Sequence, residues 1–326
     1  MCTVHRPAPR AGVRLSERMQ PDSSARHDAR PTHTWPVQIL VGTAAGLGRL
    51  DDDGTVDWLL KGDVTAIDRG WAIVDHDGMI AIDDPRTAIA TPLPALCLAS
   101  APWGVMIGTA EAHLLELGRG TSSVSPVASF DRIPTRDEWY TPSGGPPDTR
   151  SITVTPDGTP LVNVHVGGVW RGDDGSWREV IDVDNDTHQI LATTDDVVVA
   201  AAAVGFGQSE DGGRTFSWTT DGLHDTYCRA VAVADDIVLV TASTGPFTRH
   251  GAVYLRPIDS REPFTRCDNG LPEWFEGNID TFQLVARGST VVLGTDKGHV
   301  FVSQDAGISW ELAAAGIGAV RCVAIT

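Results

Sequence analysis

The sequence lacks the features that mark several large classes of protein. It has no apolar run near the roughly eighteen residues that a membrane-spanning helix needs, so we expect no membrane span. The N-terminal stretch has no apolar core of the kind that a secretion signal carries, which predicts a cytoplasmic protein. Helical periodicity of apolar residues is also missing throughout, and this argues against a helical fold.

Cysteine and basic side chains are both scarce. The five cysteines are widely spaced and form no Cys-x-x-Cys pair, so the pattern predicts buried thiols, no metal site and no cofactor. Lys and Arg number 25 against 43 acidic residues, which gives a net charge of −18. Nucleic acid and anionic lipid need basic surfaces, so neither is an expected partner. We expect a monomer.

The N-terminal residues differ in composition from the rest. Residues 1–34 hold six Arg and three acidic residues, a net charge of +3, and few large apolar groups. Such a segment cannot bury enough surface to order itself, so we predict a disordered tail over residues 1–34. A single ordered domain is then expected over residues 35–326, and it carries the remaining charge of −21.

What the sequence does contain is a repeat. Seven short runs rich in Val, Ile and Leu each lead into a turn, and they read ILVGTAAG, WAIVDHDG, VMIGTAEA, LVNVHVGG, VVVAAAAVG, IVLVTASTG and VVLGTDKG. Short strands separated by Gly and Asp turns and repeated at a near-fixed period are typical of a β-propeller. We therefore predict an all-β fold, a seven-bladed β-propeller of four-stranded antiparallel blades.

The two ends of the repeat region predict how the ring closes. The ordered chain begins near Val37 with the second strand of a unit, whereas residues 319–326, AVRCVAIT, match the first strand of a unit. The C-terminal strand is therefore expected to complete the first blade. This closure hides the strand edges that an open ring would expose.

Two turns carry a resemblance to a known family. Residues 209–216, SEDGGRTF, and residues 303–310, SQDAGISW, fit the pattern Ser-x-Asp-x-Gly-x-Thr/Ser-aromatic, and decayed copies lie at residues 173–177 and 52–58. The chain resembles Asp-box (BNR) repeat propellers over roughly residues 37–326. Families with this box include sialidases, sortilin-type receptors, two-propeller xyloglucanases and photosystem II assembly factors. The resemblance implies structural roles for Asp211, Phe216, Asp305 and Trp310.

A second repeated motif is an Asp-Thr pair that opens a strand. The copies begin at Asp148, Asp186, Asp225 and Asp280, at spacings of 38, 39 and 55 residues. In a propeller they would precede the innermost strands and converge at one opening of the channel, on what we call the top face. Asp and Thr also satisfy free N–H groups at strand starts, so a purely local structural role is an equal alternative.

The position after each Asp-Thr pair is polar or aromatic. Aligned units place Arg150, His188, Tyr227 and Phe282 there, the closing strand adds Arg321, and the second and third blades have apolar residues near Val64 and Leu96. Polar groups converging in a concave mouth predict a pocket. The predicted binding residues are Asp148, Arg150, Asp186, His188, Asp225, Tyr227, Asp280 and Arg321.

Two functions are consistent with this pattern. The first is a rigid binding scaffold whose top-face pocket takes a peptide, a glycan or a small molecule. The alternative is an exo-sialidase-like glycoside hydrolase, for which Tyr227, Asp186 and Asp225 are the catalytic candidates. The resemblance implies an arginine trio, for which Arg150, Arg249 and Arg321 are available, and a glutamate partner for the tyrosine. No such glutamate is evident beside Tyr227.

Overall fold

The structure is a computed structural model that describes residues 35, 37–141, 144–193 and 196–326. The tail predicted over residues 1–34 lies outside the described residues. No helix in the described ranges is long and apolar enough to cross a membrane.

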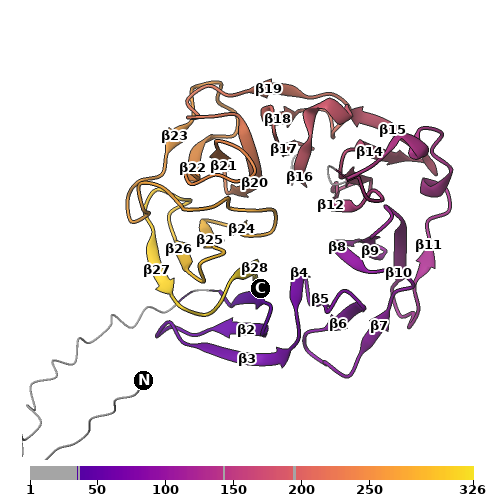
Figure 1. Ribbon diagram of the computed structural model, residues 1–326, viewed down its shortest axis with the longest axis horizontal. Coiled ribbons are helices and arrows are strands. Elements are labelled where there is room, and N and C mark those ends of the chain that lie inside the picture. The colour runs from indigo at the N-terminus through magenta and orange to yellow at the C-terminus, as the bar shows by residue number, and fades with distance from the viewer. Residues whose placement is uncertain (1–34, 36, 142–143, 194–195) are drawn as a thin grey trace, which may run out of the picture. The chain divides into compact units, whose positions relative to one another are not determined.

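Seven four-stranded antiparallel sheets follow one another around a closed ring (Figure 1). In blade 1 the order is β28 (Val320–Ile325), β1 (Ile39–Thr43), β2 (Gly46–Leu50) and β3 (Val56–Lys61). The last strand of the chain is thus the innermost strand of the first blade, as predicted. Its pairing with β1 covers the edge that β1 would otherwise expose.

Blades 2 to 4 run outward from the channel in chain order. Their strands are β4 (Val64–Asp68), β5 (Trp71–Val74), β6 (Gly78–Ala81) and β7 (Ala88–Ala90); β8 (Ala95–Ala101), β9 (Gly104–Thr109), β10 (Leu114–Gly118) and β11 (Ser125–Pro126); and β12 (Thr149–Val154), β13 (Pro160–Val164), β14 (Gly168–Asp173) and β15 (Ser176–Ile181). Two 3-10 turns, η1 (Phe130–Arg132) and η2 (Arg136–Glu138), lie between blades 3 and 4.

Blades 5 to 7 have the same order. Their strands are β16 (Thr187–Ala192), β17 (Val198–Ala202), β18 (Gly205–Ser209) and β19 (Ser217–Thr219); β20 (Tyr227–Ala234), β21 (Ile237–Ser243), β22 (Ala252–Pro257) and β23 (Thr265–Arg266); and β24 (Leu284–Arg287), β25 (Thr290–Gly294), β26 (Val300–Ser303) and β27 (Glu311–Ala314). A further 3-10 turn, η3 (Val183–Asn185), precedes β16.

The core lies between neighbouring blades. Each second strand is packed on both faces, and β1, β17 and β25 are buried at every position. This explains why the second strands read as continuous apolar runs instead of alternating ones. The cysteines of the described residues are buried and free, as predicted, and burial raises the pKa of the Cys267 thiol to about 12.

The first Ser-x-Asp turn, between β18 and β19, directs its polar side chains inward. Ser209 Oγ donates to Asp211 Oδ1 at 2.7 Å and accepts from the Gly213 N–H at 2.9 Å. Asp211 also accepts from the N–H and the hydroxyl of Thr215, at 2.9 and 2.7 Å. Burial acts to raise the pKa of Asp211, but these hydrogen bonds hold it well below its ordinary value.

The second such turn, between β26 and β27, repeats the arrangement. Ser303 Oγ donates to Asp305 Oδ1 at 2.8 Å, and Asp305 accepts from the Ser309 N–H at 2.8 Å. Trp310 is buried beneath the turn, whereas Phe216 after the first turn is half-buried. Both turns join a third strand to a fourth, so they lie on the face opposite to the starts of the innermost strands.

Candidate functional site

A β-bulge interrupts the innermost strand of six blades close to where each strand begins. A bulge adds a residue to one strand and re-aims its side chain. The residues at the bulges are Thr65, Leu96, Arg150, His188, Arg229 and Arg321. In β20 the bulge spans Arg229 and Ala230, so Tyr227, which the sequence alignment placed here, lies before it.

Each bulged arginine forms an ion pair with an aspartate that precedes the innermost strand of the next blade. The pairs are Arg150–Asp186, with 3.8 Å between Nη1 and Oδ1, Arg321–Asp63, with 2.7 Å between Nε and Oδ1, and Arg229–Asp280. We call these three pairs the blade clamps. An Asp-Thr aspartate is therefore in part a structural residue that joins neighbouring blades.

His188 occupies the bulge of blade 5, where the clamps have arginine. Its Nδ1 lies 2.5 Å from the carbonyl oxygen of Cys228, so Nδ1 carries the proton. Its Nε2 lies 3.5 Å from Asp186 Oδ2, and its ring packs edge-to-face on Tyr227 with 4.7 Å between centroids. Full burial lowers the pKa of His188, which favours the neutral ring at pH 7.

Three buried polar atoms in Asp186, His188 and Arg229 have no hydrogen-bond partner among the described residues. They are Asp186 Oδ1, His188 Nε2 and Arg229 Nε. The contact with His188, whenever that ring is protonated, and the charge of Arg150 hold the pKa of Asp186 below its ordinary value against the effect of burial, so the carboxylate is ionised. Neutral His188 presents a lone pair at Nε2. Asp186 Oδ1 and His188 Nε2 are therefore hydrogen-bond acceptors, whereas Arg229 Nε is a donor.

Arg229 links the cluster to blade 7. Its guanidinium carbon lies 5.5 Å from the centroid of the Tyr227 ring, and its Nη2 lies 3.5 Å from the Tyr227 hydroxyl. Burial acts to lower the pKa of Arg229, but Asp280 and Tyr227 raise it above its ordinary value. Arg229 is thus a permanent positive charge, and it was not among the predicted binding residues.

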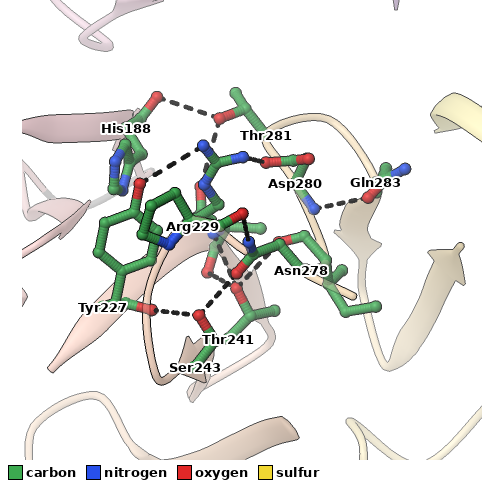
Figure 2. A network of polar contacts seen from close by, with 12 residues as sticks. His188, Tyr227, Arg229, Thr241, Ser243, Asn278, Asp280, Thr281 and Gln283 are labelled. Carbon is green, nitrogen blue, oxygen red and sulfur yellow. Dashed lines mark hydrogen bonds and ion pairs between the residues drawn. The ribbon is translucent and has the colours of Figure 1, made fainter. Parts of the chain in front are cut away.

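The segment before β24 contacts three other blades, and Figure 2 shows its contacts with blades 5 and 6. Thr281 Oγ1 lies 3.1 Å from the carbonyl oxygen of His188 and 3.3 Å from that of Arg229. Gln283 Nε2 donates to the carbonyl oxygen of Val320 at 2.5 Å. A single turn of blade 7 therefore contacts blades 5, 6 and 1 across the channel.

Phe282 of the same turn packs against the opposite side of the channel. It packs against three core clusters that include innermost-strand residues of blades 1 to 4, among them Cys322, Val64, Ala66, Cys97 and Ile152. Its carbonyl oxygen accepts from the Val323 N–H at 2.9 Å, and its backbone is left-handed, with φ of 68°. Phe282 was predicted to share the position of Arg150 and His188, whereas its ring packs against blades 1 to 4.

The predicted binding residues are brought together only in part. Arg150, Asp186, His188, Tyr227 and Asp280 lie in one connected cluster, which Arg229 joins. The other three lie apart, and no contact in the described ranges joins them to Asp186 or His188. They are Asp148, which forms an isolated bridge with Ala110, Asp225, which accepts from the Thr226 N–H, and Arg321 in its own clamp.

The electrostatics of the cluster are set by two arginines. Burial lowers the pKa of Arg150 to about 10, and the charge of Arg229 contributes to the shift. His165, in the turn between β13 and β14, has its pKa lowered to about 4 by burial and then by Arg150. At pH 7 both arginines are therefore charged, and both His165 and His188 are neutral.

Cavities lie elsewhere in the fold. One of about 740 Å³ is lined by Trp35, Arg49, Asp51 and Thr326, among others, where the ends of the ring meet. One of about 210 Å³ lies between blades 5 and 6. No group of three metal-ligating side chains occurs within the described part of the chain.

No family model and no curated protein matches the sequence. Solved structures match it at low identity. The computationally designed Ika8 protein aligns with a TM-score of 0.55 at 16% identity, over 85% of this chain and 83% of that chain. The WD40 repeats of RRP9 align with a TM-score of 0.57 at 11% identity, over 87% and 88%.

Glycoside hydrolases of family GH74 are also similar in structure. The Niastella koreensis GH74 enzyme aligns with a TM-score of 0.64 at 14% identity, over 85% of this chain and 52% of that chain. This chain therefore spans about half the length of that enzyme. At such identities the likeness shows the propeller fold alone, which hosts both enzymes and binding proteins.

Proposed function

We propose that this protein is a non-catalytic binding propeller of the Asp-box repeat kind, with its ligand site at the top of the channel over blades 4 to 6. Support for the Asp-box assignment comes from the two Ser-x-Asp turns, whose hydrogen bonds repeat each other at equivalent places in blades 5 and 7. Support for the site comes from the confinement of the polar cluster to one arc of the ring.

The observation that carries the proposal is a pair of buried acceptors that receive no hydrogen bond from the described residues, His188 Nε2 and Asp186 Oδ1, the latter 3.8 Å from Arg150 Nη1. A buried acceptor without a partner is unfavourable, so a ligand that donates hydrogen bonds to it gains affinity. Hydroxyl groups of a glycan and amide N–H groups of a peptide are such donors. A negative net charge of −18 favours a neutral or cationic ligand over an anionic one.

The sialidase-like alternative has less support. Tyr227 contacts His188 and Arg229, and no glutamate lies among its contacts in the described ranges. The arginines that would form a trio are also divided, because Arg150 and Arg321 belong to clamps of different blades. A tyrosine nucleophile needs a neighbouring base, so the geometry favours binding over hydrolysis.

A comparison of two isosteric variants tests the binding site. The full-length protein, Asp186→Asn and Asp63→Asn are applied to glycan and peptide arrays. Asp186→Asn should weaken every hit about tenfold or more, because it removes the charge from one acceptor of the pair. Asp63→Asn alters the equivalent clamp between blades 1 and 2, Arg321–Asp63, and should leave the hits unchanged. Equal effects of the two variants would refute the proposed location.

A separate assay tests the enzymatic alternative. Chromogenic glycosides, sialosides included, are incubated with the protein and with Tyr227→Phe. We expect no turnover by either protein. Turnover that disappears in Tyr227→Phe would replace the binding proposal with a glycosidase.

A further inference from the structure

Two arginines are buried on third strands of the ring, in blades 4 and 6. Arg171 on β14 is 2% exposed, and Arg256 on β22 is 3% exposed. A buried guanidinium cannot lose its charge at ordinary pH, so it needs an anionic or strongly polar partner. The two sites therefore form a natural comparison.

Arg171 is neutralised within its own strand. Its Nη2 lies 3.0 Å from Asp173 Oδ1, two residues further along β14. Its Nη1 donates to the carbonyl oxygen of Gly212 in blade 5 at 3.1 Å. Residues two apart on a strand lie on the same side of the sheet, which is why Asp173 reaches the guanidinium.

Arg256 has no carboxylate within ion-pair distance in the described part of the chain. Its Nη1 donates to the carbonyl oxygen of Glu262 at 3.4 Å and its Nη2 to Gln208 Oε1 at 3.3 Å, both of them long. The residue two positions along, where blade 4 has Asp173, is Ile258. The hydrogen-bond partners of this guanidinium in the described residues are thus all neutral.

Aromatic rings hold the Arg256 guanidinium in place. Its carbon lies 4.5 Å from the centroid of Phe264 and 5.3 Å from that of Phe206. Cation–π contacts of this kind stabilise a guanidinium without neutralising it. Burial and the nearby charge of Arg261 lower the pKa of Arg256, and the negative charge of Asp221 offsets them only in part.

Arg256 lines the cavity of about 210 Å³ between blades 5 and 6. The cavity also contains Ser217 and Trp218 of β19, Asp221, and Arg261, which is held by Glu210 at 2.7 Å. Its volume is roughly that of seven water molecules. The cavity therefore suits a small molecule.

We propose that this cavity binds the carboxylate of a small organic acid, in the position beside Arg256 that Asp173 takes beside Arg171. A planar carboxylate matches the guanidinium edge, and the blade 4 pair shows that such a partner fits this strand geometry. Asp221 in the same cavity opposes a doubly charged phosphate, and it can accept a hydrogen bond from a hydroxyl or ammonium group on the acid. This site is distinct from the channel mouth.

The sharpest test places the missing carboxylate on the protein itself. Acetate binding to the full-length protein is followed by saturation-transfer NMR at constant ionic strength, with chloride as the balancing ion. Ile258→Asp should weaken acetate binding about tenfold or more, because the new carboxylate occupies the Arg256 edge. Ile258→Asn introduces a side chain of the same shape as Asp but without the charge, so this variant should still bind acetate.

Two further arms complete the test. Arg256→Met should abolish acetate binding, and thermal melting of each variant shows whether it is folded. Inorganic phosphate should bind at least about tenfold more weakly than acetate. The proposal is overturned if acetate shows no saturable binding, if Ile258→Asp binds acetate as the natural protein does, if Ile258→Asn loses binding as Ile258→Asp does, or if phosphate binds equally well.

Discussion

The two sides of the central channel are built from the same backbone and differ in their side chains. Blades 1 to 3 and blades 4 to 6 each have a bulge at the start of the innermost strand. We call blades 1 to 3 the apolar arc and blades 4 to 6 the polar arc. The residues at the bulges are Arg321, Thr65 and Leu96 on the apolar arc, and Arg150, His188 and Arg229 on the polar arc. Phe282 packs against blades 1 to 4, while a polar network covers blades 4 to 7.

The comparison separates what the fold needs from what it leaves free. A clamp occurs on both arcs, since Arg321–Asp63 lies on the apolar one, so a clamp alone marks the joining of blades. The polar arc differs because His188 replaces the arginine of a clamp. Among the described residues, Asp225 of the next blade then accepts a hydrogen bond from the Thr226 N–H alone, and Asp186 has His188 as a second neighbour beside Arg150. The candidate site is therefore indicated by His188, where blade 5 departs from the repeated arginine clamp, and not by the clamps themselves.

Removing the closing strand is expected to have the largest effect. Deletion of residues 319–326 takes away β28, which pairs with β1 and lies beside β4 and β24. The inner edge of β1 becomes exposed, and β4 and β24 lose the strand that lies beside them, so the protein should unfold or aggregate. Circular dichroism and size-exclusion chromatography measure this. Arg321→Ala keeps the strand and serves as control; a folded, monomeric deletion variant would contradict the closure.

Removing the Phe282 ring should lower the free energy of unfolding by less than this deletion does, but it should affect both arcs. Phe282→Ala deletes a half-buried ring that contacts three clusters, and we expect a loss of about 2–3 kcal/mol in the free energy of unfolding. Urea denaturation measures the change. Phe282→Leu fills most of the same space and should cost clearly less. A loss below about 0.5 kcal/mol for Phe282→Ala, the range of ordinary surface changes, would show that the packing of this ring does not stabilise the fold.

The ring was predictable from sequence, and the reason is local. Second strands buried on both faces need apolar residues at every position, and short turns need Gly or Asp, so the pattern repeats visibly seven times. The closure followed because a first strand at the C-terminus, β28, and a second strand near Val37 must find each other.

The residues at the bulges of the candidate site were predictable from sequence only in blades where the bulge lies directly after the Asp-Thr pair. Arg229 was missed because β20 pairs two residues, Tyr227 and Cys228, before its bulge, whereas β12 pairs only one. That register depends on contacts such as the Ala230 N–H donating to Thr241 Oγ1 at 2.9 Å. The inward course of Phe282 depends likewise on packing against distant blades, which no local pattern encodes.

Breaking one clamp on each arc should sharpen the comparison. Arg229 is 18% exposed and Arg321 is 45% exposed, so the first charge is less screened by solvent. Arg229→Met should lower the free energy of unfolding by about 1–3 kcal/mol, and Arg321→Met by at most about 1 kcal/mol. Double-mutant cycles with Asp280→Asn and Asp63→Asn isolate each pair. A coupling as large on the apolar arc as on the polar one would argue against a special environment.

The smallest expected effect is a pH dependence confined to the polar arc. Burial and Arg150 lower the pKa of His165 from 6.5 to about 4, so folding favours its neutral form. The resulting stability is fully present above pH 6.5 and is lost as the pH falls towards 4. Because the ring is partly exposed, we expect a contribution of about 1 kcal/mol or less.

Titration of the His165 ring by NMR tests this contribution directly. Arg150→Met removes a neighbouring positive charge, so it should raise the pKa of His165 towards its ordinary value. Arg321→Met removes the same charge from the apolar arc and should leave that pKa unchanged. Acidification reduces the net negative charge of the natural protein and of both variants to nearly the same extent. Its effect on the pKa of His165 therefore cancels when the three proteins are compared. If both variants shifted His165 equally, the net charge of the protein, and not the local arginine, would set its titration, and the two arcs would be electrostatically alike.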